Sequence, residues 1–396
     1  MQLADEILEK TDGKICKHCL GRMLSKTIDG EDNVSRAESL DIELGSECVI
    51  CGNVFDKIDD VLFDKIYDKL DFLNVEFDSF IVGSRIDKEI QKRDEEFIDQ
   101  LNLDVEPIKK EINRIIGKRL EKELSKEVNF EKQDIIVNVN LIKDPKIRVQ
   151  INPIFIEGKY NKLIRGIPQT KWPCSKCKGR GCEECNFTGK QYPCSVEELI
   201  SEHILKATDG YEAKFHGAGR EDIDVLMLGS GRPFVLEIKE PKIRKIDLNK
   251  LENEINEINQ GKTQYHNLKF TYRNRKAEIK VSSPDAYKVY KALVECEEAY
   301  DAQKLADLSQ LGEIHQRTPI RVSHRRADKV RIKHVLDLSC EVIDDTHFEM
   351  TIKTEGGLYI KELISGDEGR SQPNVADKLG VKAVCKQLDV IEVSEK

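Results

Sequence analysis

Four C-x-x-C pairs constrain this chain more than any other feature, and they hold eight of its twelve cysteines. The pairs are Cys16/Cys19, Cys48/Cys51, Cys174/Cys177 and Cys182/Cys185. Two thiolates separated by two residues can grip one tetrahedral Zn²⁺ from a turn, and two such pairs complete a structural site. A secreted disulfide scaffold would be short and would spread its cysteines along the chain. The pairs therefore predict two structural zinc sites in an intracellular protein, and His18, inside the first pair, is not expected to be a ligand.

The charge balance argues against a polyanionic partner at first. The 396 residues contain 64 Lys and Arg against 73 Asp and Glu, a net charge of −9. The cations are clustered, however, in the stretches 158–181 and 317–333. One basic run is usually a solvated face, whereas two runs, one around a zinc knuckle, favour a track for phosphates. The predicted contacts to nucleic acid are Lys162, Arg165, Arg317, Arg321, Arg325, Arg326, Lys329 and Arg331.

Periodicity and length indicate an α+β protein with several domains. No apolar run reaches the roughly 18 residues of a membrane span, and the first residues lack a signal-peptide core, so we expect a soluble, cytoplasmic protein without membrane contact. Residues 108–120 predict an amphipathic helix, and capping residues predict helices over 195–206 and 247–259. Alternating stretches predict strands at 134–142, 146–156, 268–272, 277–282, 287–295, 334–343 and 347–353, and a hairpin around Gly229–Gly231. The expected domains are a zinc-binding segment (1–54), a smaller α/β module (55–170), a second zinc knuckle (171–192) and an α+β domain with a mostly antiparallel sheet (193–396).

The densest polar cluster is H-G-A-G-R-E-D-I-D at 216–224. A glycine-bracketed loop beside a strand suits a catalytic carboxylate, and Arg220 could hold Asp222 ionised by ion pairing. A turn with solvated charges is the simpler interpretation of the same letters. Two further functions stay open. Asp224, Glu237 and Lys239 have the D…E-x-K spacing of Mg²⁺-dependent nucleases, and a non-catalytic, zinc-stabilised RNA-binding adaptor would explain the cysteines and the basic runs.

The stretch G-A-G-R-E-D-I-D-V-L-M-L-G-S-G-R-P-F resembles the signature of the archaeal and eukaryotic tRNA pseudouridine synthases that modify uridines 54 and 55. Segments such as Q-R-T-P-I-R-V-S-H-R-R-A-D, G-G-L-Y-I-K-E-L-I and I-N-R-I-I-G-K agree in order, so the resemblance covers nearly the whole chain. It implies a pseudouridine synthase domain with a mixed, mostly antiparallel sheet in the second half, preceded by a zinc-bearing, THUMP-like RNA-binding module.

The resemblance also implies roles for individual residues. Asp222 matches the catalytic aspartate, Tyr290 the active-site tyrosine, Lys361 the basic partner of the aspartate, and Leu388 the apolar residue near the target base; neighbouring Tyr287 is the alternative to Tyr290. Arg220 is expected to assist Asp222. The reaction has no redox step, so structural zinc and no organic cofactor are expected. The implied partner is tRNA, with no obligate protein partner. Position 54 or 55, and attack on the sugar or removal of a sugar proton, stay open.

Overall fold

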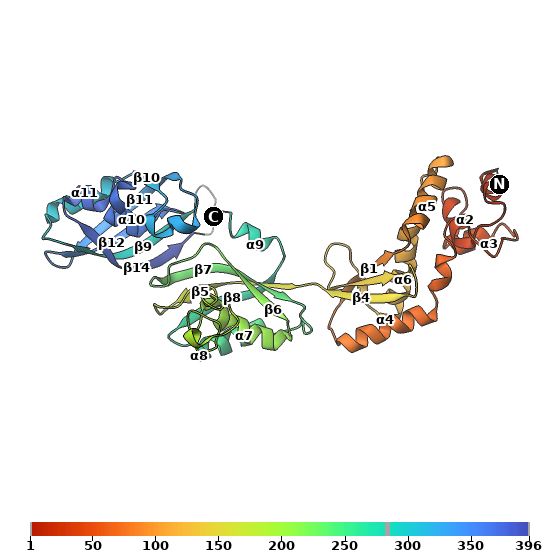
Figure 1. Cartoon of the computed structure of the whole chain (residues 1–396), viewed down its shortest axis with the longest axis horizontal. Helices are drawn as coiled ribbons and strands as arrows, with labels where there is room; N and C mark the ends of the chain where they lie inside the picture. Colours follow the sequence, from red (N-terminus) through yellow and green to blue (C-terminus); the bar gives the residue numbers. More distant parts are fainter. Residues whose placement is uncertain (1, 282–285, 395–396) are drawn as a thin grey trace. The chain divides into compact units, whose positions relative to one another are not determined.

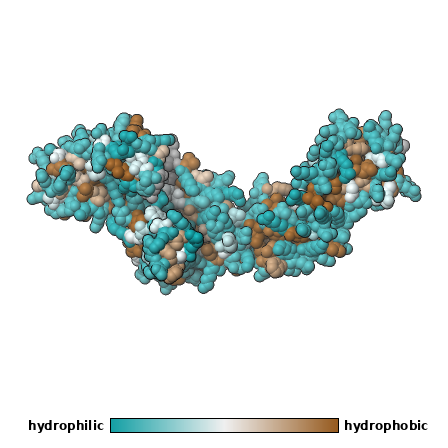
Figure 2. Space-filling model, viewed as in Figure 1, coloured by the Kyte–Doolittle hydropathy of each residue, from teal (hydrophilic) through white to brown (hydrophobic). Residues whose placement is uncertain are grey.

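Two sheets, one of four strands and one of ten, organise the chain into two units (Figure 1). The computed structural model describes residues 2–281 and 286–394. Unit 1 comprises Met1–Pro153 together with Lys239–Lys245, and unit 2 comprises Ile154–Ile238 and Ile246–Lys396. No helix within the described residues is long and apolar enough to cross a membrane. Figure 2 shows a mostly hydrophilic surface in which apolar side chains form scattered patches, as expected when each unit encloses its own core.

Unit 1 combines helices with a four-stranded sheet in the order β2-β1-β3-β4. Its strands are β1 (Ser79–Arg85), β2 (Glu127–Val128), β3 (Ile135–Asn140) and β4 (Lys146–Ile151). Its helices are α1 (Gln2–Thr11), α2 (Lys17–Met23), α3 (Asn33–Glu38), η1 (Val54–Lys57), α4 (Asp60–Leu73), α5 (Lys88–Gln100) and α6 (Ile108–Leu124). β1 pairs in parallel with β2 and β3, and β3 pairs antiparallel with β4.

Apolar periodicity explains both kinds of element in unit 1. Ile135, Val137 and Val139 occupy every second position of β3 and are all buried, while Ile136, Asn138 and Asn140 between and after them are only partly buried, as one covered face of a sheet requires. On α6, Ile108, Ile112, Ile116 and Leu120 follow the helical repeat and are buried in the same core. The helix predicted over 108–120 is therefore confirmed, with its end at Leu124.

Unit 2 is built on a sheet in the order β13-β10-β11-β12-β9-β14-β7-β5-β8, with β6 paired to β7. Among the described strands of this sheet, only β7 and β14 run parallel, so the predicted mostly antiparallel sheet is confirmed. Its strands are β5 (Ile154–Lys162), β6 (Glu212–Gly217), β7 (Leu226–Lys239), β8 (Thr263–Thr271), β9 (Tyr287–Cys296), β10 (Glu313–Arg317), β11 (Val330–Val342), β12 (His347–Glu355), β13 (Ser371–Gln372) and β14 (Ala383–Val393).

Two helices of unit 2 carry the caps expected for them. The helices of this unit are η2 (Glu183–Cys185), α7 (Val196–Thr208), α8 (Leu248–Ile258), α9 (Arg275–Glu278), η3 (Ala302–Gln310), η4 (Ile320–Arg325), α10 (Ile360–Ser365), η5 (Asp367–Gly369) and α11 (Val375–Leu379). The Ser195 hydroxyl accepts a hydrogen bond from the Glu198 amide at the start of α7, and the Asp247 carboxylate caps α8. α7 and α8 share one apolar core with β5, β7 and β8 (Figure 1).

Three predictions about these elements are wrong. Residues 277–281 form no strand, because α9 and the turn after it occupy them, while residue 282 lies outside the described residues. Gly229 and Gly231 lie inside β7 rather than in a hairpin turn. They belong to a bulge of β7 opposite β5, where the register of the two strands shifts. Finally, 146–156 is not one strand, since β4 ends at Ile151 and Pro153 separates it from β5.

The end of the first module also differs from the expectation. β5 pairs with β7 and β8, so it belongs to the large sheet of unit 2 rather than to the module expected over 55–170. Asn152 and Pro153 separate the two sheets, because proline offers no amide hydrogen to a ladder. The stretch from β5 to the zinc knuckle therefore lies beside the expected active-site residues.

Candidate active site

A cavity of about 750 Å³ opens on unit 2 between the loop that follows β6, strands β9 and β14, and the segments around η4 and α10. All five of the predicted catalytic residues line it: Arg220, Asp222, Tyr290, Lys361 and Leu388. Six further basic residues line it as well: Arg232, Lys288, Arg321, Arg326, Arg331 and Lys333. The tertiary structure thus collects residues that lie more than 160 positions apart in one positively charged hollow.

Asp222 lies on the loop of residues 218–225 between β6 and β7, here called the Asp222 loop. Its carboxylate Oδ2 lies 3.0 Å from Arg321 Nη1 and 3.7 Å from Lys361 Nζ, and 36% of its side chain is exposed. The carboxylate therefore stands between two cationic side chains. The predicted pairing of Lys361 with Asp222 is present, while Arg321 was expected only to contact nucleic acid.

Lys361 and Arg321 each hold a second acidic partner. Lys361 Nζ lies 2.7 Å from Asp224 Oδ2, and Arg321 Nε donates to Glu362 Oε1 at 2.5 Å. Partial burial raises the pKa of Asp224, but the hydrogen bond and the charge of Lys361, a backbone hydrogen bond and the charge of Lys162 together outweigh burial and leave this pKa below its ordinary value. The two cations are therefore fixed from α10 and η4 before any substrate arrives.

Arg220 does not take the place expected for it. Its guanidinium lies over the Trp172 ring, 5.7 Å from the ring centroid, and Trp172 contacts Tyr192 edge to face. Among the described residues, the cations within 4 Å of the Asp222 carboxylate are Arg321 and Lys361. The expected ion pair between Arg220 and Asp222 is thus corrected: Arg220 stands at the rim of the cavity, stacked on an aromatic side chain.

A buried polar network supports the Asp222 loop from behind. The Glu221 carboxylate, 6% exposed, accepts hydrogen bonds from Tyr160 Oη at 2.8 Å and from Arg232 Nε at 3.0 Å. Arg232 Nη1 also donates to the Ala218 carbonyl. Burial, and next the Glu221 charge, raise the pKa of Tyr160 well above its ordinary value, so its phenol stays protonated. Glu221 therefore has a structural role: it ties the Asp222 loop to Tyr160 and Arg232.

Tyr290 and Leu388 form the floor of the cavity. Tyr290 on β9 lies opposite Val390 of β14, and Ala292 lies opposite Leu388. Lys288 shares the face of Tyr290, because side chains two positions apart in a strand point the same way. Tyr287 points to the other face, where its hydroxyl donates to Glu392, so Tyr290 rather than Tyr287 shares the cavity with Asp222.

Burial shifts the titration of both polar side chains on this floor. It raises the pKa of Tyr290 to about 12, so the phenol is neutral near pH 7. It lowers the pKa of Lys288 to about 8, with the Arg232 charge acting in the same direction and Glu221 opposing both. The floor thus combines an apolar surface and an aromatic ring with one amine that titrates close to neutrality.

Two of the predicted nucleic-acid contacts point into the protein instead. Lys162 is fully buried, and its ammonium donates to the carbonyls of Ile167, Asp222 and Ile223. Arg165 donates to the carbonyls of Asp224 and Leu388, and it pairs with Asp389 at 2.5 Å. The sequence alone does not distinguish these internally bound cations from exposed ones, because both kinds stand in the same basic run.

The second basic run does lie beside the cavity. Arg321, Arg326 and Arg331 line it, and Arg326 donates to the Tyr359 hydroxyl at 2.9 Å. Arg317 is exposed but makes a two-pronged contact with Asp328. Lys329 is exposed directly before β11, and the Arg325 side chain lies outside the part of the structure that is described. Contact of these cations with nucleic acid stays a prediction.

The nuclease alternative is contradicted by the positions of its carboxylates. Asp224 lies beside Lys361, whereas Glu237 pairs with His216 at 3.0 Å and with Lys276 at 2.9 Å. Along β5, Lys162 faces Met227 and Phe155 faces Glu237. Seven residues of strand separate these two positions, roughly 23 Å at about 3.3 Å per residue. Asp224 and Glu237 therefore cannot hold one Mg²⁺ ion, because β7 continues where a hairpin was expected.

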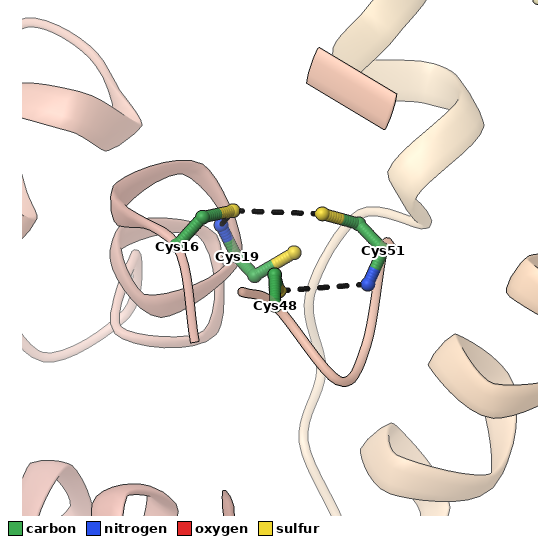
Figure 3. A group of neighbouring side chains, drawn as sticks. All are labelled: Cys16, Cys19, Cys48 and Cys51. Carbon is green, nitrogen blue, oxygen red and sulfur yellow. Dashed lines mark hydrogen bonds between the residues drawn. The ribbon is translucent and has the colours of Figure 1, made fainter. Parts of the chain in front are cut away.

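The first cysteine group lies in unit 1, where α2 and the turn before η1 meet. Figure 3 shows Cys16, Cys19, Cys48 and Cys51 converging, and the sulfurs of Cys16 and Cys51 lie 3.6 Å apart. All four sulfurs lie within 4.8 Å of one another. Zn–S bonds of about 2.3 Å in a tetrahedron place sulfurs about 3.8 Å apart, so the donor set fits the ion. His18 stacks on Phe55 and faces Glu111, outside the group, as expected.

The second cysteine group forms the centre of a small zinc-knuckle segment in unit 2. Cys174 Sγ and Cys182 Sγ lie 3.9 Å apart, as do Cys177 Sγ and Cys185 Sγ. The only buried cluster of this segment consists, in the part of the chain that is described, of these cysteines themselves. The fit to a tetrahedral ion is as good as in unit 1, but no apolar core surrounds it.

Several residues of the cavity were missed in the sequence. Arg321 was placed among the nucleic-acid contacts rather than beside Asp222, and Lys288, Arg232 and Tyr359 were not singled out at all. Tyr359 stands in the segment G-G-L-Y-I-K-E-L-I that carried the family resemblance, and Lys288 stands two positions before Tyr290, which was the available signal. Arg232 also stands in a stretch that carried the resemblance, at the end of G-A-G-R-E-D-I-D-V-L-M-L-G-S-G-R-P-F, and its burial beside Glu221 becomes visible only in the structure.

Comparison with known proteins gives consistent matches along the chain. The family described as "Pus10, C-terminal" matches residues 155–394, and "Pus10 THUMP domain, archaeal" matches residues 62–140. A relative from Methanothermobacter marburgensis, named tRNA pseudouridine synthase Pus10, is 53% identical over 99% of this chain and 98% of its own length. A relative of the same name from Methanosphaera stadtmanae is 42% identical over 96% of this chain and 95% of its own. A chain in a solved Cbf5-Nop10-Gar1 complex is similar at 18% identity and a TM-score of 0.32, covering 50% of this chain and 45% of that one.

Proposed function

Because this chain belongs to the Pus10 family, we propose that it is a tRNA pseudouridine synthase that isomerises a uridine in the T-loop of tRNA, at position 54, 55 or both. One observation carries the proposal: the Asp222 carboxylate stands between Arg321 and Lys361 in a cavity floored by Tyr290 and Leu388. An ionised carboxylate beside an aromatic and apolar floor suits a flat, uncharged base attached to a sugar. The relatives that match the whole chain carry the name of this activity.

The reaction breaks the bond between N1 of the uracil and C1′ of the ribose, turns the base, and forms a bond between C5 and C1′. A proton leaves C5, and N1 ends with a proton, so nothing is oxidised and no group is lost. In our proposal Asp222 acts on the nucleoside at the sugar, either as nucleophile or as base. Arg321 and Lys361 hold its carboxylate in place, and Tyr290 lies beneath the base and assists removal of the C5 proton.

The target must leave its stack to reach Asp222, because the bond to be broken is enclosed in a folded RNA loop. We propose that Arg326, Arg331 and Lys329 bind phosphates beside the cavity and hold the extruded nucleotide there. Unit 1, which contains the match to the THUMP family, would grip another part of the tRNA, and unit 2 would be the catalytic domain. Both cysteine groups would hold structural Zn²⁺, and the protein would act in the cytoplasm.

One assay tests this proposal against its alternatives. The chain is incubated with an unmodified tRNA transcript in EDTA, and pseudouridine is mapped by carbodiimide-dependent stops of reverse transcription. We expect a new stop at position 54 or 55, intact RNA, and no product with Asp222→Asn at unchanged tRNA affinity. RNA cleavage, or binding without any product from the wild-type chain, would contradict the proposal. Loss of binding in Asp222→Asn would make Asp222 a structural residue.

A further inference from the structure

The segment 160–169, which joins β5 to the zinc knuckle, forms a bed for the Asp222 loop. Four side chains of this bed reach the loop and, with one amide of the bed, hold it at successive positions. Gln169 Nε2 donates to the Gly219 carbonyl, Tyr160 Oη to the Glu221 carboxylate, Lys162 Nζ to the Asp222 and Ile223 carbonyls, the Gly166 amide to the Ile223 carbonyl, and Arg165 Nη1 to the Asp224 carbonyl.

Lys162 is the centre of this arrangement. Its side chain is 0% exposed, and its Nζ lies 3.0 Å from the Asp222 carbonyl, 3.2 Å from that of Ile223 and 3.1 Å from that of Ile167. An ammonium group has three hydrogens to donate, and here three carbonyl oxygens accept them. A buried cation is costly unless such partners surround it. The ammonium therefore belongs to the loop, and no phosphate of an RNA can reach it.

The position of the Asp222 backbone depends on these contacts. The Asp222 loop is irregular between β6 and β7, so ladder hydrogen bonds do not define its path. The Asp222 carbonyl accepts from Lys162 and also from the Val225 amide at 3.1 Å. Arg165 links the same loop to the Leu388 carbonyl on β14, the strand that supplies the cavity floor. The bed thus sets the distance between the Asp222 carboxylate and the floor.

We propose that Lys162 is a positioning residue for the reaction, which holds Asp222 at the height above Tyr290 and Leu388 that the chemistry requires. This inference rests on the proposed function for its kinetic part only. Removal of the ammonium takes one donor from each of three carbonyls, two of which belong to the Asp222 loop, and so loosens the backbone at Asp222. A shift of about 1 Å in a reacting group can cost about 100-fold in rate.

Lys162→Met in the full chain tests the proposal, because methionine keeps the aliphatic stem and removes the donor. We expect the single-turnover rate of pseudouridine formation to fall by roughly 10- to 100-fold, while the Kd for tRNA and its dependence on salt stay unchanged. Amide exchange in residues 219–225 should become faster. Lys329→Met, which removes an exposed cation of the basic run, should instead weaken the Kd for tRNA and lower the salt slope of binding by about 1.

Ile204→Ala separates positioning from general loss of stability. Ile204 lies buried on α7, away from the cavity, and its truncation lowers the melting temperature of unit 2 without touching the loop. At a temperature where both variants are folded, Ile204→Ala should keep the wild-type rate and normal exchange at 219–225.

A wild-type rate in Lys162→Met, a weakened Kd with a normal rate, or an equal rate loss in Ile204→Ala would each overturn the inference. If the wild-type chain formed no pseudouridine, the proposed function would fail. The exchange of residues 219–225 would still report whether Lys162 holds the loop.

Discussion

At the scale of single residues, the cavity depends on cations that were difficult to assign from their letters. Arg321 and Lys361 stand beside Asp222, whereas Arg220, two positions before it, stacks on Trp172. Lys162 and Arg165, which belong to the basic run over 158–181, donate hydrogen bonds to backbone carbonyls of the protein itself. Arginine and lysine can each donate to phosphates, carboxylates and backbone carbonyls, so the neighbours of each side chain decide which of these it binds.

Tyr290 and Tyr287 provide a matched pair for the role of the phenol. Tyr290→Phe keeps the ring on the cavity floor but removes the hydroxyl, so we expect the single-turnover rate to fall by about 100-fold or more at unchanged tRNA affinity. Tyr287→Phe loses only the hydrogen bond to Glu392, which should cost about 1 kcal/mol of stability or less and leave the rate normal. Equal rates for the two variants would remove the phenol of Tyr290 from the mechanism.

Lys288 predicts a pH dependence of tRNA binding. Burial beside Arg232 lowers the pKa of Lys288 to about 8, so the cavity loses a positive charge as the pH rises from 7 to 9. The Kd for tRNA should therefore increase over this range, as measured by filter binding at constant ionic strength. Burial also lowers the pKa of Lys162 to about 8, so a change of Kd in the wild-type chain could come from either lysine. Lys288→Met is therefore the necessary comparison. Its Kd should be weaker at pH 7 and should change less up to pH 9; an identical pH profile would contradict the assignment.

At the scale of elements, strand β7 decides which residues can meet. It runs from Leu226 to Lys239, pairs in parallel with β14 at its start and antiparallel with β5 along its length, and contains a bulge at Gly229 and Gly231. This continuity keeps Asp224 and Glu237 apart and brings the Asp222 loop next to β14. A hairpin turn at the same glycines would have folded the chain back and brought Asp224 close to Glu237.

Gly229 should be among the least replaceable positions of β7. Its φ is +60°, and a Cβ atom there would lie 1.9 Å from the Ile391 carbonyl oxygen of β14. Gly229→Ala should therefore destabilise unit 2 by more than the roughly 1 kcal/mol that a left-handed alanine costs by itself. Gly261→Ala measures that strain alone, because Gly261 has φ +76° and nothing within 4 Å of its Cβ position. Equal losses in denaturant unfolding would show that β7 and β14 can move apart at this point.

At the scale of the whole molecule, the two cysteine groups have different surroundings. Cys19, Cys48 and Cys51 belong to the hydrophobic core of unit 1, with residues such as Leu20 and Val54. The second group forms a cluster of its own, made of cysteines alone. A metal ion in the first group would therefore stabilise a whole unit, whereas one in the second would stabilise only the knuckle around it.

This difference predicts the consequence of losing each metal ion. The purified chain should contain two zinc ions, measured by mass spectrometry. Cys19→Ser should lower the melting temperature of the unit 1 transition in calorimetry, because it opens the core. Cys182→Ser should leave both main transitions in place and make residues 172–192 sensitive to protease. A similar loss in both variants, or no zinc in the wild-type chain, would contradict this division of roles.

The features that depend on short-range patterns could be predicted from the sequence alone. Cysteine spacing, strand alternation on β3 and β9, helix periodicity on α6 and the caps at Ser195 and Asp247 depend on neighbours within a few residues, and the family motifs identified Asp222, Tyr290, Lys361 and Leu388 as members of one site. Only the tertiary structure decided what each cation faces, that β5 belongs to the second sheet, and that Gly229 lies in a bulge rather than a turn. Those outcomes depend on contacts between residues up to some 220 positions apart, such as Arg165 and Asp389, which no short-range pattern encodes. The four C-x-x-C pairs predict where metal can bind. The packing around each cysteine group decides how much of the protein a bound metal ion stabilises.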